Sequence, residues 1–539
     1  MQIAASPAER VETGLGVGPG APPAPAPAPK ARWAIPLAVV AAVLVAGLDS
    51  PSGGSITDER LYLSIVGDLR DHGLWFTPTL EGVPDFTKPP LLYWAGRASL
   101  ALFGVSLWAA RLPVAISALL LALVAWRLGR RFAGERGAVR ALLLVGTCLG
   151  VLRYGRLLMM DIPLALAVAV GVEQAWAAAT EERPWALIWT GRAAGVAALL
   201  KGPVGPFLVF GITGLLLLRL APRLLRSPAA LAALGVAAVV GLPWFIGMAV
   251  VHGRPFVDRF LWVEHVGKFG VPWSLSRAAL LVGSLALFCL PWVPLVRWRG
   301  ASPGLRLLAG VWAGTVLLVF LVPGYKMQQY VVPALVPVLL LAACPDVRRW
   351  AVRVPAVLMA LLGLLSMAGL RLPFGTGLRL ALLAQALLLA GATVLLWRGR
   401  VEGGAVAFAG AAVLAFAVVL PAVNPAEPRD APWPGPGNRI LVYRDEPVLL
   451  ERLFGRPVRR VKHWDQLLDG ARPGDAVVMP AADVASLPPE VRSRLRPAAS
   501  WRRLRSPVLP GDLLSALERG DLEPIQEGVQ LSVVGNETR

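Results

Sequence analysis

Two short segments carry residues whose types and spacing suit group-transfer chemistry. The sequence TDERLY at residues 57–62 places two adjacent carboxylates, Asp58 and Glu59, just after the first apolar run. A second segment, GVPDFTKPPLLYW at residues 82–94, contains Lys88 directly before two prolines. A carboxylate can orient or deprotonate a nucleophile, and a lysine on a stiff turn can hold a phosphate as a point charge. The combination favours transfer from a phosphate leaving group, whose growing negative charge needs a cation.

Each of these residues also has a purely structural interpretation. Asp58 and Glu59 stand where a helix is expected to begin, and carboxylates in a first helical turn interact well with unpaired N–H groups and the helix dipole. Lys88 equally fits a lysine that snorkels at a membrane boundary. The local sequence leaves both interpretations open.

Further polar residues stand at the ends of later apolar runs, on the face of the protein where Asp58 is expected. They are Asp161, with Arg153 and Arg156 nearby, Lys201, His265, Tyr325, Lys326 and Tyr330. Ionisable residues at this depth are costly unless they are paired or face a cavity. Each has a structural alternative. Asp161 could form a purely structural pair with an arginine, and Lys201 could complement a helix C-terminus. His265 could be a surface histidine, and the tyrosines could belong to an aromatic belt. The gathering of all these residues on one membrane face favours a site.

The composition shows that these residues must be positioned by membrane helices. The chain of 539 residues is 56% hydrophobic and 16% charged, with a mean hydropathy of +0.61, whereas soluble domains are about 25% charged. A helix needs about 20 apolar residues to cross a bilayer. Thirteen candidate spans fall near residues 33–48, 106–126, 138–154, 162–179, 186–200, 203–219, 229–250, 278–296, 305–322, 330–344, 353–370, 378–397 and 404–422.

The basic residues predict the orientation of these spans. Connections rich in Lys and Arg stay on the cytoplasmic side, and with thirteen spans the basic clusters all fall on one side of the membrane. Residues 1–32, rich in Pro, Ala and Gly, are then a disordered cytoplasmic tail without the features of a signal peptide. Residues 33–423 form the transmembrane domain, and residues 424–539 form an outer domain.

The first outer connection and the C-terminal region are expected to be folded. Within the connection at residues 49–105, residues 61–69 and 91–103 are predicted as amphipathic helices on the membrane surface. In the C-terminal region, residues 440–443 and 476–480 resemble buried strands, and residues 446–454 resemble a helix. We therefore expect an all-α polytopic membrane protein with a small extracytoplasmic α/β domain.

The net charge of +19 does not indicate nucleic-acid binding, because the basic residues form neither a stripe nor a known reader module. Most of them lie between apolar runs, where they set orientation and meet membrane lipids. The three cysteines lack metal-ligand or disulfide-framework spacing. No His-rich ligand set requires a metal, although a divalent ion near the acids remains an open alternative.

Read in order, these segments resemble the ArnT-like (lipid A aminoarabinose transferase-like) glycosyltransferases, which are related to protein O-mannosyltransferases and share the GT-C fold. The resemblance covers about residues 45–345, and the C-terminal region matches only in placement and size. It is carried by the acid pair at 58–59, KPPLLYW at 88–94, FGVSLWAARLP at 103–113, the Arg and Asp of 153–161, LKGP at 200–203, PWF at 243–245, and 326–333.

The resemblance implies a bacterial inner-membrane enzyme that transfers a sugar, with inversion, from a polyprenyl-phosphate donor such as undecaprenyl phosphate. The acceptor would be lipid A, another envelope glycan or a protein on the outer face. Asp58 would be the base, supported by Glu59, and Asp161 the acid of the second outer loop. The implied donor-phosphate ligands are Lys88, Arg60, Lys201 and Lys326, and the implied cavity residues are Tyr62, His265, Tyr325 and Tyr330.

Two rival functions remain. A transporter or flippase of lipid-linked sugars would be expected to have mid-membrane charged sites and an internal repeat, and the sequence shows neither. A non-catalytic scaffold would not need Asp58 and Lys88, whereas changing either residue should inactivate an enzyme that still folds.

Overall fold

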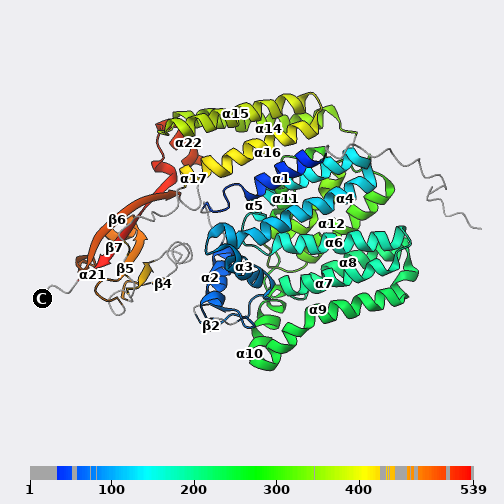
Figure 1. Cartoon of the computed structure of the whole chain (residues 1–539), viewed down its shortest axis with the longest axis horizontal. Coiled ribbons are helices and arrows are strands. Elements are labelled where there is room, and N and C mark those ends of the chain that lie inside the picture. The colour runs from blue at the N-terminus through cyan, green and yellow to red at the C-terminus, as the bar shows by residue number, and fades with distance from the viewer. Residues whose placement is uncertain are drawn as a thin grey trace, which may run out of the picture.

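The protein is a helical bundle with a small sheet at one end, as the computed structural model in Figure 1 shows. The structure describes residues 33–50, 57–72, 75–80, 82–344, 346–424, 433, 435, 438–443, 458–461, 463–465, 471–504 and 510–535. The predicted tail at residues 1–32 and the predicted helix at 446–454 lie outside the described residues.

Among the described residues, seven helices are long and apolar enough to cross a bilayer. They are α4 (Leu107–Thr147), α6 (Asp161–Thr180), α9 (Pro228–His252), α12 (Pro303–Leu321), α14 (Arg349–Ala368) with η7 (Gly369–Arg371), α15 (Thr376–Trp397), and α16 (Val401–Leu414) continued by η8 (Ala415–Val419) and α17 (Leu420–Val423). The chain is therefore a multi-pass membrane protein, as its composition predicts.

The other predicted spans coincide with shorter helices or helix pairs. These are α1 (Ala34–Val45), α5 (Leu149–Tyr154), η1 (Pro184–Ala186) with α7 (Leu187–Lys201), α8 (Val204–Leu220), α11 (Leu275–Phe288) with η5 (Val293–Leu295), and η6 (Gln328–Ala334) with α13 (Leu335–Ala342); η2 (Pro222–Arg226) connects α8 and α9. All thirteen predicted apolar runs thus fall on helical segments, although several are shorter than a full crossing needs.

The longest helix, α4, consists of two segments that fold back on each other. The backbone leaves helical geometry at Ala133 and at Gly134, whose φ is +66°. A Cβ placed on Gly129 would lie 2.7 Å from the Cβ of Ala141, so the two segments run side by side. This break explains why the sequence predicts two spans here, at 106–126 and 138–154.

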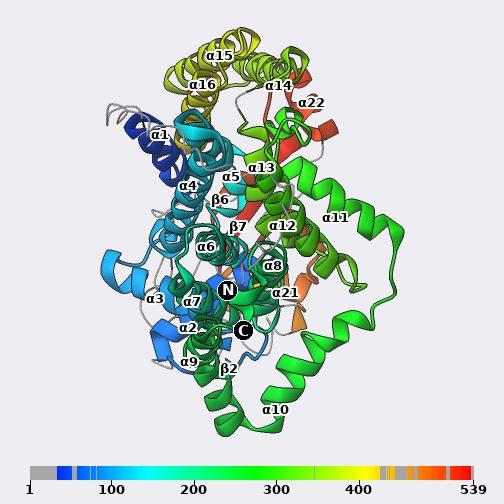
Figure 2. The ribbon, with the colours of Figure 1, turned by 90° about the vertical axis from the view of Figure 1, so that its right-hand side faces the viewer.

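Small residues allow the membrane helices to pack closely, which is the usual means of helix association in lipid. Gly191 and Gly195 of α7 lie against Ala233 and Val240 of α9. Figure 2 shows α7 and α9 on one side of the bundle and α14, α15 and α16 grouped on the other. The cavity described below belongs to the α7 side.

The described part of the connection predicted to be the first outer one lies at one end of the bundle (Figure 1). It contains α2 (Thr57–His72), the hairpin of β1 (Thr79–Leu80) and β2 (Val83–Pro84), and α3 (Leu91–Phe103). Both predicted helices, at 61–69 and 91–103, are confirmed as helices. Because α2 packs on α3, the segments that contain Asp58 and Lys88 are held close to each other.

A second connection, between α9 and α11, lies at the same end and is called the α9–α11 connection (residues 253–274). It contains α10 (Arg254–Val257), the π-helical turn η3 (Asp258–Val263) and η4 (Val266–Phe269). Phe256 and Phe260 stack with ring centroids 5.3 Å apart and pack on Trp244 of α9. These aromatic contacts fix the base of the connection.

The C-terminal region forms a five-stranded sheet in the order β4-β3-β5-β7-β6. Its elements are β3 (Ile440–Tyr443), β4 (Val458–Val461), β5 (Ala476–Pro480), α20 (Ala481–Ser486), α21 (Pro489–Arg494), β6 (Leu495–Leu504), α22 (Pro510–Arg519), η9 (Glu523–Ile525) and β7 (Gln526–Val534). The sheet is mixed, because β3 is parallel to β4 and β5 whereas β7 is antiparallel to β5 and β6. Both predicted strands, 440–443 and 476–480, are confirmed.

Candidate active site

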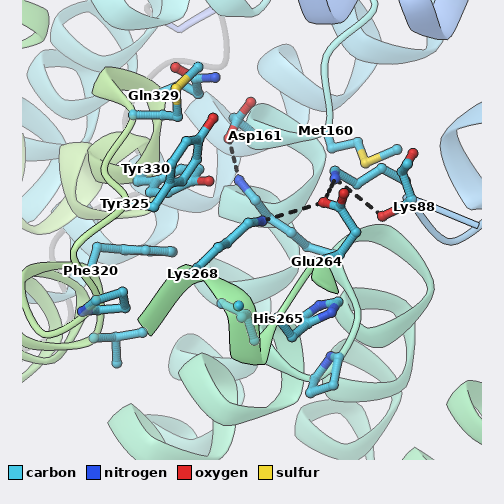
Figure 3. A pocket seen from close by; sticks show the side chains of 18 of the residues that line it. Lys88, Met160, Asp161, Glu264, His265, Lys268, Phe320, Tyr325, Gln329 and Tyr330 are labelled. Atoms are coloured by element: carbon cyan, nitrogen blue, oxygen red, sulfur yellow. Dashed lines mark hydrogen bonds and ion pairs between the residues drawn. The ribbon is translucent and has the colours of Figure 1, made fainter. Parts of the chain in front are cut away.

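A cavity of about 970 Å³ opens where the connection that contains α2 and α3 and the α9–α11 connection meet the bundle. Eight of the eleven predicted site residues line it: Asp58, Tyr62, Lys88, Asp161, Lys201, His265, Tyr325 and Tyr330. Figure 3 shows five of them, Lys88, Asp161, His265, Tyr325 and Tyr330, on different sides of the cavity, and they come from elements far apart in the chain. On the side of α8 and α12, the lining is apolar and largely exposed, with Phe207, Leu318 and Val322 each more than half accessible.

Asp58 lies in the first turn of α2 and faces the cavity. Gln329 Nε2 donates a hydrogen bond to Asp58 Oδ2 over 3.3 Å. Burial raises the pKa of Asp58, and the charge of Asp161 raises it further, while Lys88 and Lys201 act in the opposite direction. A carboxylate with a raised pKa is a stronger base at neutral pH, provided that it is still ionised.

Asp161 forms a close ion pair with Lys201, whose Nζ lies 2.6 Å from Asp161 Oδ1. Asp161 begins α6 and Lys201 ends α7, so the pair joins two helix ends at the floor of the cavity. The ammonium also lies 4.7 Å from the ring centroid of Tyr330. The Asp161 side chain is only 4% exposed. Because the pair is buried, it is a fixed part of the cavity wall.

Asp161 pairs with Lys201 and not with the arginines of its own loop, a pairing that was one of the structural alternatives. Arg156 instead donates to the carbonyl oxygens of Val43 and Leu44 at the end of α1, over 2.6 and 3.3 Å. Its guanidinium also stacks on Phe416, 3.9 Å from the ring centroid. A helix C-terminus with unsatisfied carbonyl groups attracts a cation, which explains why Arg156 contacts the end of α1.

Lys88 is presented to the cavity by a tight turn. Thr87 donates from its N–H and its Oγ1 to the carboxylate of Asp85, over 3.2 and 2.7 Å, which closes a local turn just before Lys88. Pro89 and Pro90 then lead into α3. Lys88 Nζ lies 3.2 Å from Glu264 Oε2 on the opposite connection.

Glu264 is the centre of a charged cluster that the sequence did not predict. Its carboxylate contacts Lys268 at 3.8 Å, in addition to Lys88 (Figure 3). It also contacts Arg259 at 3.4 Å. Burial alone would raise the pKa of Glu264, but Lys88, Lys268 and Arg259 together hold it below its usual range. Burial, with the charge of Lys88, lowers the pKa of Lys268 to about 8.

His265 fixes the α9–α11 connection against the turn between α7 and α8. Its Nδ1 lies 2.7 Å from the carbonyl oxygen of Phe260, and its ring lies against Gly202. Gly202 has φ +64°, and a Cβ there would be only 2.7 Å from His265 Nε2. Burial lowers the pKa of His265, which favours the neutral imidazole.

Three predicted site residues, Glu59, Arg60 and Lys326, do not line the cavity. Glu59 is 1% exposed and accepts from Arg111 Nε at 2.8 Å and Nη2 at 3.0 Å. It also accepts from the N–H of Leu158 at 2.9 Å. Lys326 donates to the carbonyl of Pro323 and lies over Trp273. Glu59 therefore holds the start of α2 in place and does not face the reacting groups.

Four residues of the site, Asp85, Glu264, Lys268 and Gln329, were not predicted from the sequence, although some of them lie in recognisable sequence patterns. Glu264 and Lys268 have the four-residue spacing of a helical ion pair, a signal that was available beside His265. Asp85 precedes Thr87 in a typical Asx-turn pattern. Gln329 left no trace, because nothing in the local sequence indicates that it meets Asp58. Among the described residues, no group of three or more His, Cys, Asp or Glu residues is placed to hold a metal ion.

The chain matches a family model described as dolichyl-phosphate-mannose-protein mannosyltransferase over residues 87–246. It is 31% identical over 307 residues to an undecaprenyl phosphate-alpha-4-amino-4-deoxy-L-arabinose arabinosyl transferase of Sodalis glossinidius, covering 53% of this chain and 54% of the relative. A relative with the same description from Pseudomonas fluorescens is 29% identical over 333 residues, covering 58% and 57%. The chain thus spans little more than half the length of the curated relatives it matches.

The fold is also that of a solved structure. The crystal structure of ArnT from Cupriavidus metallidurans bound to undecaprenyl phosphate superposes with a TM-score of 0.65 and 21% identity, covering 92% of this chain and 97% of that one. The apo structure of the same protein gives a TM-score of 0.67. The shared architecture extends beyond the aligned sequence to nearly the whole chain, including the C-terminal region.

Proposed function

We propose that the chain belongs to the ArnT-like family of GT-C proteins and that it is an integral membrane glycosyltransferase. Its donor is a sugar carried on a polyprenyl phosphate, as the names of its relatives suggest. The observation that carries the proposal is the convergence of Asp58, Asp161, Lys88 and Lys201 on one cavity. These residues come from α2, α6, the turn before α3 and α7.

Asp58 is the proposed base. The acceptor nucleophile attacks the anomeric carbon of the donor sugar, its proton passes to the Asp58 carboxylate, and the bond from that carbon to the phosphate oxygen breaks. The phosphate leaves with the bonding electron pair on the face opposite the attack, so the anomeric configuration inverts. The hydrogen bond from Gln329 supports this role, because it orients the carboxylate toward the cavity.

Lys88 is the proposed ligand of the donor phosphate. Its ammonium lies at the end of a rigid turn and within the same cluster as Lys268 and Arg259. Cations placed beforehand at a leaving phosphate stabilise its growing charge without reorganising. Lys201 is held by Asp161, so we assign it to the wall that shapes the sugar subsite. Tyr62, His265, Tyr325 and Tyr330 complete the substrate cavity.

The proposed location is the bacterial inner membrane, with the active site and residues 424–539 on the outer side. The distribution of basic residues supports this orientation. The acceptor is a lipid such as lipid A, another envelope glycan or a protein exposed on that face. We propose domain boundaries at residues 33–423 and 424–539, which the end of α17 and the beginning of the sheet region support.

The test is release of free polyprenyl phosphate from a labelled donor by purified protein supplied with an envelope acceptor. We expect Asp58→Asn to slow this release by at least about 100-fold, the low end of general-base contributions. Asp68→Asn, on the same helix but outside the cavity lining, is the matched control and should retain most activity. Undiminished release by the Asp58 variant would remove that residue from the mechanism, and transport without release would favour a flippase.

A further inference from the structure

The carboxylate of Glu264 lies in the place that a bound phosphate would be expected to take. Three cations surround it: Lys88 Nζ at 3.2 Å, Arg259 at 3.4 Å and Lys268 Nζ at 3.8 Å. All four side chains line the cavity. Lys88 comes from the first outer connection, whereas the other three belong to the α9–α11 connection. The cluster is an anion site whose present occupant is part of the chain.

We propose that Glu264 is an internal competitor for this anion site, which a substrate phosphate must displace and which helps expel the phosphate product. The inference rests on the proposed function for the identity of the ligand, a polyprenyl phosphate. The competition itself rests only on the geometry of the four side chains.

The charges of substrate and product explain why such a competitor is useful. The donor is a phosphodiester with one negative charge. Breakage of the bond to the sugar leaves a phosphate monoester, which carries about −1.5 to −2 charges at pH 7. Three cations without a counter-ion would therefore hold the product more tightly than the donor. If the Glu264 carboxylate returns to the cations as the product leaves, it shortens the time for which the phosphate product stays bound.

The contacts of Glu264 are suited to exchange. Its side chain is 17% exposed, and those of Lys88, Lys268 and Arg259 are 22%, 31% and 51% exposed. Ion pairs with this access to water have small net stability, so breaking them costs little. Because Glu264 is tethered next to its partners, its effective concentration is of the order of millimolar. By contrast, the Asp161 carboxylate is almost fully buried in its pair with Lys201.

The alternative is that Glu264 is only a strut that fastens the α9–α11 connection to Lys88. A strut and a competitor make opposite predictions for phosphate binding. Without the strut the cations would separate, and an anion would bind more weakly. Without the competitor the cations would stay free for the ligand, and an anion would bind more tightly.

The experiment measures the dissociation constants of inorganic phosphate and of undecaprenyl phosphate with the full-length purified protein. We expect Glu264→Gln to lower both constants at least about fivefold, since one charge competitor at a partly exposed site is removed. Glu264→Asp, which retains the charge but withdraws it by one methylene, should lie between this variant and wild type. Under turnover, Glu264→Gln should show a burst of product followed by a slower steady state.

Asp258→Asn is the matched control, because Asp258 lies on the same connection and pairs only with the exposed Arg254, 3.7 Å away, among the interactions described. It should bind phosphate as wild type does. Unchanged or weaker phosphate binding by Glu264→Gln overturns the proposal, and wild-type binding by Glu264→Asp indicates a general field effect and overturns it as well. Tighter binding by a protein that transfers no sugar would retain the competitor and reject the proposed function.

Discussion

The two walls of the cavity are built in different ways. The side formed by α2, α6 and α7 depends on buried pairs: Asp161 with Lys201 in the wall itself, and Glu59 with Arg111 of α4 behind it. The wall formed by the α9–α11 connection holds Arg259, Glu264 and Lys268 in longer contacts that water can reach. Buried pairs fix positions, whereas exposed pairs exchange partners. The first wall is therefore suited to placing a base, and the second to binding and releasing an anion.

The largest expected difference between the walls is in stability. Arg111→Met leaves the Glu59 carboxylate buried without its cation, and breaking such a pair costs about 3–5 kcal/mol. Arg254→Met removes a partner from the exposed pair with Asp258 and should leave stability unchanged within error. Thermal unfolding in detergent measures both. The double variant Arg111→Met with Glu59→Gln should recover part of the loss, and equal effects of the two arginine variants would remove the distinction between the buried and the exposed pairs.

The second expected effect concerns the seating of the α9–α11 connection. In Gly202→Ala the new methyl group meets the His265 ring, so the connection must shift. Because a displacement of about 1 Å can cost about 100-fold in rate, we expect kcat/KM to fall by about 10- to 100-fold. Gly253→Ala is the control, since Gly253 has a similar φ of +59° but nothing within 4 Å of the added Cβ. A similar loss in both variants would show backbone strain, not the contact with His265, to be the cause.

The smallest expected effect is a pH dependence of phosphate binding. The pKa of Lys268 is lowered to about 8, so its ammonium is charged below that pH and neutral above it. Phosphate affinity of the wild type should therefore weaken as the pH rises through about 8, by about two- to fivefold for one partly exposed charge. Lys268→Met should bind more weakly below pH 8 and lack this step. An identical pH profile in the two proteins would exclude Lys268 from the anion site.

Local patterns in the sequence were sufficient for most of the helical architecture. Length and apolarity located all thirteen runs, and the break at Gly134 separates two of them where the sequence predicts it. The strands β3 and β5 were predicted because each is a short buried run. The strands β6 and β7 were not, because many of their residues are polar and β6 is an edge strand. Their pairing depends on long-range contacts, which local patterns do not show.

In the candidate site, too, local sequence predicted individual residues but not their long-range contacts. Asp58 and Lys88 were identified from local sequence, and their place in one cavity required the packing of α2 on α3. The partner of Asp161 was left open, with a nearby arginine as one alternative, because the observed partner Lys201 lies forty positions away in the chain. Glu264 was passed over although its spacing from Lys268 is that of a helical ion pair, and only the folded connection shows that Lys88 meets it as well. Side chains that act through partners on another element are the ones that a single sequence conceals.

The exposed apolar side of the cavity lies at Phe207, Leu318 and Val322. It determines which concentration of the proposed donor governs binding, the concentration in the bilayer or the concentration in solution. A reactant whose hydrocarbon tail passes through this side never has to enter bulk water. Its encounters with the protein then depend on the number of donor molecules per lipid molecule, and not on their number per litre. Diluting the bilayer with inert lipid slows such encounters even when the total amount of donor is unchanged, whereas adding buffer does not.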